Sequence, residues 1–351
     1  LAGAADHLDR SQVTGVTALQ SEVKLLGFRA YLLRRAIYAL LVLFVILSFN
    51  FAVFRLMPGD PSSLIIDPRF TPEAIALLRQ QFGLDDPPFV QYVKYIKNLV
   101  TFDLGQSFTS RRPVVDELKE RLPNTITLFL TSFTLTALLG IAVGVFAAAR
   151  RGSFSETFVT GAGLFTYAVP TFFFQLLLLL IFGYYIPIFP IHGTMSAPPP
   201  DGTWAQLLDR LHHLVLPAGS NVIIGFGSWA LYTRNAMLEA LSQDYIVTAR
   251  AKGLSGRAIL YHHALRSVLP PIVTLVFLSL PGLVTGAVIT ETIFSWHGVG
   301  RYLVDAVLQQ DYPAAQGAFY LIAIAVIVSN FLADLVYGLV DPRIRVAGEH
   351  A

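Results

Sequence analysis

Long apolar stretches, separated by shorter polar segments, dominate the pattern of this 351-residue chain. A helix needs about 20 apolar residues to cross the hydrocarbon core of a bilayer. The apolar stretches are continuous and do not alternate every second residue, which favours helices over the strands of a membrane barrel. The pattern predicts an all-α integral membrane protein with six transmembrane helices. We expect them at about 36–56, 125–149, 157–186, 214–233, 268–290 and 317–339.

Composition supports this fold class. Hydrophobic residues make up 54% of the chain and charged residues 14%, with a mean hydropathy of +0.59. In a typical soluble protein about 25% of residues are charged. The formal net charge of +2 is too small to indicate a nucleic-acid partner. The chain has no cysteine, which excludes disulfides, thiol catalysis and thiolate metal sites.

Basic residues in the short loops predict the orientation, because Lys and Arg are retained on the cytoplasmic side. Arginine pairs precede the first span and separate the second from the third, at positions 34–35 and 150–151. A basic segment also follows the fourth span. Both termini are therefore predicted to be cytoplasmic, in a multi-pass protein of a prokaryotic cell membrane that contacts membrane lipid.

The polar segments divide the chain into parts. The first span is not followed by a cleavage site, so we expect it to stay in the mature protein. The Pro-rich loop at 187–213 should hold a short helix near 204–211. In chain order we expect a cytoplasmic segment at 1–35, the first transmembrane helix at 36–56, a small extracytoplasmic subdomain at 57–119 with a helix at about 71–83, a five-helix core at 120–340 that includes a cytoplasmic loop at 238–268, and a cytoplasmic tail at 341–351.

The sequence shows no recognisable catalytic motif. It lacks a G-x-x-x-x-G-K-[ST] phosphate loop, an H-E-x-x-H zinc motif and a G-x-S-x-G nucleophile elbow. The histidine pairs at 212–213 and 262–263 have no carboxylate at metal-ligand spacing. The centres of the second to fifth spans carry no charged residue, which disfavours an ion-driven carrier. We therefore expect no catalytic, metal or cofactor site on this chain.

Uncharged polar residues occur within the spans. Two interpretations remain open for them. Thr and Asn side chains often form hydrogen bonds between packed helices. The same residues could instead line a weakly polar translocation path. The candidates for such a path are Thr127, Thr131, Thr134, Gln175 and Asn221.

The basic segment at 244–270, which we call the hairpin, is too long for a loop that only sets topology. Asp244 is predicted to cap a helix in which Tyr245, Ile246 and Ala249 form an apolar stripe. Gly253 and Gly256 should bracket a turn, followed by a second helix at about 257–268. Arg250 and Lys252 face away from the stripe. The pattern indicates a surface that docks into a cytoplasmic partner.

The hairpin resembles the coupling segment of ABC importer permeases, and most closely that of the dipeptide/oligopeptide branch, B-type subunit. The branch pattern D-Y-x-x-T-A-R-A-K-G-L-S appears at 244–255, H-A-L-R at 263–266 and L-P at 269–270. FRLMPGDP at 54–61, DLGQSF at 103–108, ERLPNTI at 120–126 and the ending NFLADLVYGLVDPRIR also fit. Ser267 and His297 depart from the pattern, as does the absence of the glutamate of the general E-A-A motif. The first 30 residues lie outside the resemblance.

The resemblance implies a type I permease that pairs with a homologous second permease, two ATPase subunits and an external solute-binding protein. ATP and Mg would be bound by the ATPases. The region at 58–121 and the segment 291–300 would face the binding protein. Arg250, Lys252 and Arg266 would supply docking charges. The full set of implied coupling residues is Asp244, Tyr245, Thr248, Ala249, Arg250, Ala251, Lys252, Gly253, Leu254, His263 and Arg266.

Peptides are the cargo that the resemblance implies, carried by alternating access. The same machinery could import oligosaccharides or nickel. A stand-alone channel or carrier, or a membrane-embedded enzyme, are alternatives of a different class. Copurification of ATPase subunits would separate these classes.

Overall fold

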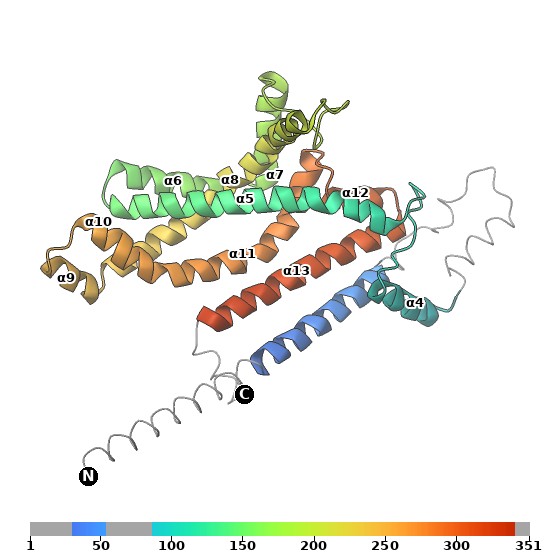
Figure 1. Cartoon of the computed structure of the whole chain (residues 1–351), viewed down its shortest axis with the longest axis horizontal. Coiled ribbons are helices and arrows are strands. Elements are labelled where there is room, and N and C mark those ends of the chain that lie inside the picture. Colours follow the sequence, from blue (N-terminus) through green and yellow to red (C-terminus); the bar gives the residue numbers. More distant parts are fainter. Residues whose placement is uncertain (1–29, 54–85, 341–351) are drawn as a thin grey trace, which may run out of the picture.

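The computed structural model describes residues 30–53 and 86–340, and these are mainly helical (Figure 1). Within this part of the chain there is no β-strand beyond the isolated bridge between Gln106 and Pro113. The helices are a first one at Ala30–Val53, then α4 (Pro88–Val100), α5 (Val114–Ala149), α6 (Phe154–Ala168), α7 (Thr171–Leu179), α8 (Thr203–Leu241), α9 (Asp244–Ala251), α10 (Gly256–Ala258), α11 (Leu265–Ile293), α12 (Val299–Leu308) and α13 (Tyr312–Val340). Two π-helical turns, η1 (Leu180–Tyr185) and η2 (Ile259–Ala264), continue α7 and join α10 to α11.

The long helices run between two ends of the molecule (Figure 1). The hairpin end carries α9 and α10, and the α12 end carries α12 and α4. The first helix lies beside α13, where Tyr31 Oη donates to Asp334 O and Arg35 pairs with the Asp334 carboxylate at 3.1 Å. The start of the first helix and the last turns of α13 are thereby held together.

Glycines allow α5, α6 and α8 to pack closely. A Cβ at Gly144 of α5 would lie 2.6 Å from Ala230 O on α8. A Cβ at Gly227 of α8 would lie 2.7 Å from Gly163 Cα on α6. Small residues at membrane-helix interfaces let backbones approach and gain dispersion contacts that lipid does not replace. Helix α8 therefore packs closely on both α5 and α6.

Five helices are long and apolar enough to cross a membrane, or six if one bent pair counts as a span. This confirms the all-α membrane fold class. The expected boundaries change in places: α5 begins at residue 114, ahead of the expected 125, and α8 absorbs the separate short helix expected near 204–211. Pro123 and Pro217 lie inside these helices without ending them.

The third expected span, 157–186, is wrong as a single straight helix. It consists of α6 and of α7 continued by η1, which meet at an angle of 98°. Pro170 has no N–H to continue α6 and disfavours helical geometry in the preceding residue. Val169 is accordingly extended, with φ −80° and ψ 127°. The proline therefore turns the chain at this point.

Much of the expected extracytoplasmic subdomain, including the helix expected at 71–83, lies outside the described residues, as do most of segment 1–35 and the tail 341–351. The described remainder of the subdomain begins with α4. Asn50 of the first helix donates to Tyr95 Oη of α4 at 2.9 Å, and Tyr320 Oη of α13 donates to Leu99 O at 3.1 Å. Burial raises the pKa of Tyr95 to about 12. Helix α4 is thus fixed against both neighbours.

Candidate functional site

The hairpin is anchored to the bundle by one buried face of α9. Ile246 is fully buried and Ala249 is 4% exposed. They belong to a single apolar cluster, called here the hairpin cluster, that joins α5, α8, α9, η2 and α11. Its buried members are Val145, Ala148, Met237, Ala240, Ile246, Ala249, Ile259, Ala264, Val268 and Ile272.

The opposite face of the hairpin is exposed. Val247 is 62% and Leu254 39% exposed, and the basic side chains of Arg250 and Lys252 lie on the same open surface. Thr248, Ala251 and Arg266 are exposed as well, whereas His263 is half-buried. Gly253 adopts φ +74°, the left-handed conformation that glycine tolerates best, and it ends α9. The expected turn at Gly253 is confirmed.

Three details of the expected hairpin are corrected. Asp244 is not the N-cap: Gln243 holds that position, and no side chain caps the first turn. Tyr245 does not belong to the buried stripe. Its ring is 42% exposed and its hydroxyl is 2.7 Å from Ser267 Oγ. The second helix is not separate, because α10 continues through η2 into α11. Ser255 caps α10 by accepting from Ala258 N.

A second group of polar side chains lies among the spans. Gln175 of α7 is fully buried, and its Nε2 donates to Asn221 Oδ1 at 3.0 Å and to Thr290 Oγ1 at 2.8 Å. Asn221 Nδ2 donates to Ser132 Oγ at 3.4 Å. We call these four residues the Gln175 cluster. It ties α5, α7, α8 and α11 together by directional bonds, while Gln175 Oε1 has no hydrogen-bond partner among the described residues.

The structure brings together only two of the expected path residues, Gln175 and Asn221. The buried stripe of α5 runs instead through Leu128, Ser132 and Thr136 at intervals of four. Thr127 and Thr134 are exposed, Thr131 is half-buried, and Thr127 Oγ1 donates to Pro123 O in its own helix. Ser132 and Thr290 were missed because a serine beside threonines, and a threonine at the end of a span, look unremarkable in sequence.

At the α12 end, a buried carboxylate shapes the loop between α11 and α12. Glu291 is fully buried; its Oε1 accepts from Thr125 Oγ1 at 2.7 Å and its Oε2 from Arg301 N at 3.0 Å. The carboxylate thus lies at the N-terminus of α12, where an anion is favoured. A Cβ at Gly298 would collide with it. Glu291 therefore requires glycine at that position.

Most of the segment 291–300 cannot present side chains to a partner. Glu291, Phe294 and Trp296 are buried. Trp296 Nε1 donates to Asn124 O at 3.0 Å, and Asn124 Nδ2 donates to His297 O at 2.8 Å. The expectation that this segment faces a binding protein is therefore restricted to its exposed residues, such as His297.

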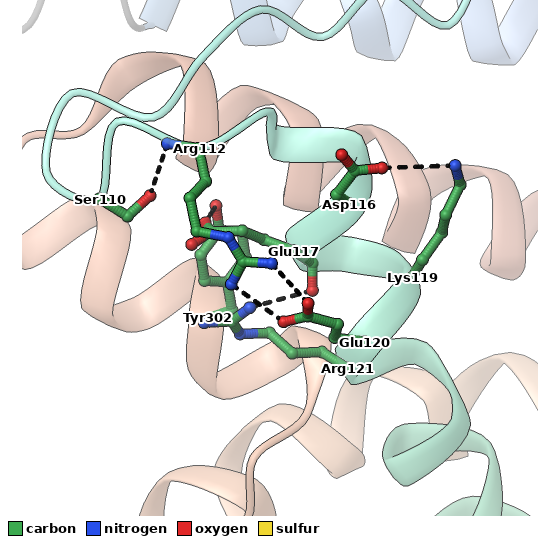
Figure 2. Close-up of polar contacts among 8 residues, drawn as sticks. All are labelled: Ser110, Arg112, Asp116, Glu117, Lys119, Glu120, Arg121 and Tyr302. Atoms are coloured by element: carbon green, nitrogen blue, oxygen red, sulfur yellow. Dashed lines mark hydrogen bonds and ion pairs between the residues drawn. The ribbon is translucent and has the colours of Figure 1, made fainter.

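Figure 2 shows the start of α5 beside Tyr302 of α12. The Tyr302 hydroxyl donates to the buried Glu117 carboxylate, and the Arg121 guanidinium lies 4.3 Å from the centre of the Tyr302 ring. Burial, followed by the hydrogen bond to Glu117, raises the pKa of Tyr302 well above its usual range. Arg112 pairs with Glu120 on the exposed side (Figure 2). Helices α5 and α12 are thus joined through a desolvated tyrosine–carboxylate contact.

The described residues include no group of three or more His, Asp or Glu side chains that could hold a metal ion. The adjacent histidines 212 and 213 make loop and helix contacts. His212 Nε2 is 2.8 Å from Ile188 O, and His213 Nδ1 is 2.8 Å from Asp209 O. Their rings serve local structure at the start of α8.

The structure is a bundle of apolar helices that carries an exposed, basic hairpin at one end. Family models match most of the chain: that of the binding-protein-dependent transport system inner membrane component covers residues 140–346, and the N-terminal model of such membrane components covers 28–129. The chain belongs to this family of ABC transporter permeases. Members work in the inner membrane with other permease, ATPase and binding-protein subunits.

The match to curated relatives extends over nearly the whole length of each relative. The oligopeptide transport system permease protein AppB of Bacillus subtilis is 36% identical over 90% of this chain and 99% of its own. The di/tripeptide transport system permease protein DppB of Pseudomonas aeruginosa and the dipeptide transport system permease protein DppB of Escherichia coli are each 37% identical, over 90% of this chain and 98% of their own. These relatives are transport permeases.

Proposed function

We propose that this chain is a permease subunit that passes di- and oligopeptides across the inner membrane, using ATP hydrolysed by partner subunits. The observation that carries the proposal is the hairpin, which is buried on one face by Ile246 and Ala249 and open and basic on the other. A segment built this way can receive force from a partner and pass it to the spans. The proposed mechanism is alternating access without covalent chemistry on this chain.

The cargo assignment rests on the relatives, which are named for dipeptides, di/tripeptides and oligopeptides. This favours peptides over oligosaccharides or nickel. The polar side chains of the candidate path are amides and hydroxyls, which can exchange hydrogen bonds with a peptide backbone without requiring a particular cargo side chain. In the assembled transporter, Thr127, Thr131 and Thr134 would border the path with Gln175 and Asn221.

The hairpin would act as a lever. Its buried residues share one apolar cluster with α5, α8 and α11, so a displacement of α9 would move these spans together as a rigid body. Arg250, Lys252 and Arg266 would pair with acidic groups of an ATPase, and Tyr245 and Leu254 would make apolar contact. Asp244, Thr248, Ala249, Ala251, Gly253 and His263 complete the proposed coupling set.

The proposed orientation places the hairpin end in the cytoplasm, together with both termini. The start of the first helix, the loop between α5 and α6, and the hairpin lie toward this end of the bundle (Figure 1). All three segments carry arginines, as expected for basic loops retained inside. The α12 end would then face an external solute-binding protein. A homologous second permease would complete the path, and two ATPases would bind ATP and Mg.

Two substitutions in the hairpin test the lever. Gly253→Pro cannot adopt φ +74°, because proline fixes φ near −65°. Arg250→Glu reverses a docking charge. Both should abolish peptide uptake and substrate-stimulated ATP hydrolysis in proteoliposomes while leaving membrane insertion intact. Gly253→Ala is the matched control: its Cβ would meet no atom within 4 Å, so its cost is the backbone strain alone, about 1 kcal/mol.

Normal uptake by both the Gly253→Pro and Arg250→Glu variants would contradict the lever. Copurification in mild detergent tests the class itself. An ABC importer permease should bring down two ATPase subunits. A stand-alone channel, carrier or membrane enzyme would bring down none.

A further inference from the structure

A largely buried ion pair joins α6 to α8 in the half of the bundle nearer the hairpin. Glu156 Oε1 accepts from Arg234 Nε at 2.9 Å and also from a terminal nitrogen of the same guanidinium. The Glu156 side chain is 9% exposed and that of Arg234 is 23% exposed. The second carboxylate oxygen, Oε2, accepts from Gly152 N at 2.5 Å. Both oxygens of Glu156 are therefore held in place.

The local sequence explains how Glu156 reaches this position. Ser153 is the N-cap of α6, and its hydroxyl accepts from Glu156 N at 3.3 Å. Glu156 is the third residue of α6, the position of the acidic residue in a capping box. Here Oε2 accepts from Gly152 in the loop before α6, and Oε1 accepts from Arg234 of α8. The carboxylate thus does more than cap its own helix.

The hairpin cluster joins α5, α8, α9, η2 and α11, but among the described residues none from α6 belongs to it. Further along, α6 meets α8 through Gly163 and Gly227, whose backbones touch. The contact between these glycines depends on close packing and contains no charge-assisted hydrogen bond. The Glu156–Arg234 pair supplies such a contact and sets the register of α6 on α8.

Helix α6 continues through the 98° bend into α7, which carries Gln175. Arg234 lies about two turns before α8 ends next to the hairpin. We propose that Glu156 and Arg234 are positioning residues that transmit the displacement of α8 to α6, α7 and the Gln175 cluster. This inference rests on the proposed function of the hairpin as a lever. It assigns the two charges a role in coupling rather than in cargo binding.

The test uses the permease assembled with its ATPases and binding protein in proteoliposomes, with peptide uptake and ATP hydrolysis measured in the same sample. Glu156→Gln keeps one oxygen that can accept from Gly152 N, but it replaces the oxygen that accepts from Arg234 with an amide N–H₂ and removes the charge. Arg234→Gln removes the guanidinium. In each, uptake per ATP hydrolysed should fall about tenfold, within the range typical of coupled sites. Arg234→Lys keeps the charge and should retain most of the coupling.

The matched control is Arg210→Gln, which removes an exposed arginine from the same helix and should change nothing. Wild-type uptake per ATP in both glutamine variants would overturn the inference while leaving the proposed function standing. If instead the unaltered chain fails to bind ATPases or to transport peptides, the proposed function itself fails. A merely structural role would lower the amount of folded protein without changing uptake per ATP.

If the glutamine variants do not accumulate, spin labels decide the question. The chain contains no cysteine, so labels attach only at Phe158→Cys on α6 and Tyr232→Cys on α8, where the native side chains are 65% and 38% exposed. The inference expects the distance between the two labels to stay constant when the ATPases bind ATP. A nucleotide-dependent change in that distance would overturn it.

Discussion

The two ends of the molecule are held by different kinds of contact. The hairpin end is anchored by apolar side chains, chiefly Ile246 and Ala249, packed among four other elements. The α12 end also has an apolar cluster, around Val114, Leu118 and Val299, but it adds buried carboxylates: Glu291 is bound to Thr125 and Arg301, and Glu117 to Tyr302. Apolar contacts are non-directional and tolerate a tilt, whereas hydrogen bonds to a buried charge hold one geometry. The comparison indicates a lever at one end and a rigid frame at the other.

The largest loss of stability is expected from removing the Glu291 carboxylate at the α12 end. Glu291→Ala leaves the partly buried Thr125 hydroxyl and Arg301 N–H without this acceptor and removes a fully buried side chain, which together should cost about 3–4 kcal/mol of stability. Glu291→Gln keeps one acceptor oxygen and should cost less than half as much. Thermal unfolding in detergent measures both. Equal stability of the alanine variant and the native chain would mean that Glu291 does not hold the frame.

The next largest loss of stability is expected from shortening Ile246, which anchors the hairpin to the bundle. Ile246→Ala removes a fully buried side chain from the hairpin cluster and should cost about 2–4 kcal/mol. Val273→Ala, at a position of α11 that is 37% exposed and lies outside the open face of the hairpin, should change stability by less than about 0.5 kcal/mol. The first variant should also lower uptake per ATP, while the second should not. A similar loss of coupling in both would show that the buried face is not what transmits motion.

The smallest effect concerns pH at the α12 end. Burial, followed by the positive charges of Arg301 and Arg121, lowers the pKa of His297 below its usual 6.5. Below about pH 6.5 the unfolded chain therefore binds a proton at His297 more readily than the folded chain does. Stability should fall as the pH drops through 6.5 and should be unaffected well above it. His297 is partly exposed to solvent, which keeps the effect small.

His297→Gln removes this titration and should flatten the pH profile of the unfolding temperature between about pH 5 and 7, where an ordinary histidine titrates. Tyr245→Phe serves as the control, because it changes a side chain of the hairpin and leaves His297 in place. An unchanged slope in the His297→Gln variant would assign the pH response to another group.

Several parts of the fold were predictable because they depend on local sequence. An apolar run of about 20 residues is a span wherever it occurs, and five such helices appear near the expected positions. A glycine between a polar helix and a basic turn indicates a left-handed residue, and Gly253 is one. Pro170 was visible in the third span, but its consequence, a bend of 98°, depends on how α7 packs against α8 and α11.

The buried faces of the helices were harder to predict. On α5, one stripe contains Thr127, Thr131 and Thr134, and another contains Leu128, Ser132 and Thr136. Both have helical spacing and similar chemistry, so periodicity cannot choose between them. The choice follows from Gly140 and Gly144, which continue the second stripe and admit the backbone of α8.

By itself, the sequence determined the membrane class, the number and approximate positions of the apolar helices, and the location of the basic hairpin, because each depends on local composition and short spacings. Only the tertiary structure decided which polar groups meet. Gln175 contacts Thr290, which is 115 positions away in the sequence. Glu156 contacts Arg234 across 78 positions, and Glu291 contacts Thr125 across 166. A buried polar group must be satisfied, but its partner is chosen by helix packing, which local sequence does not encode.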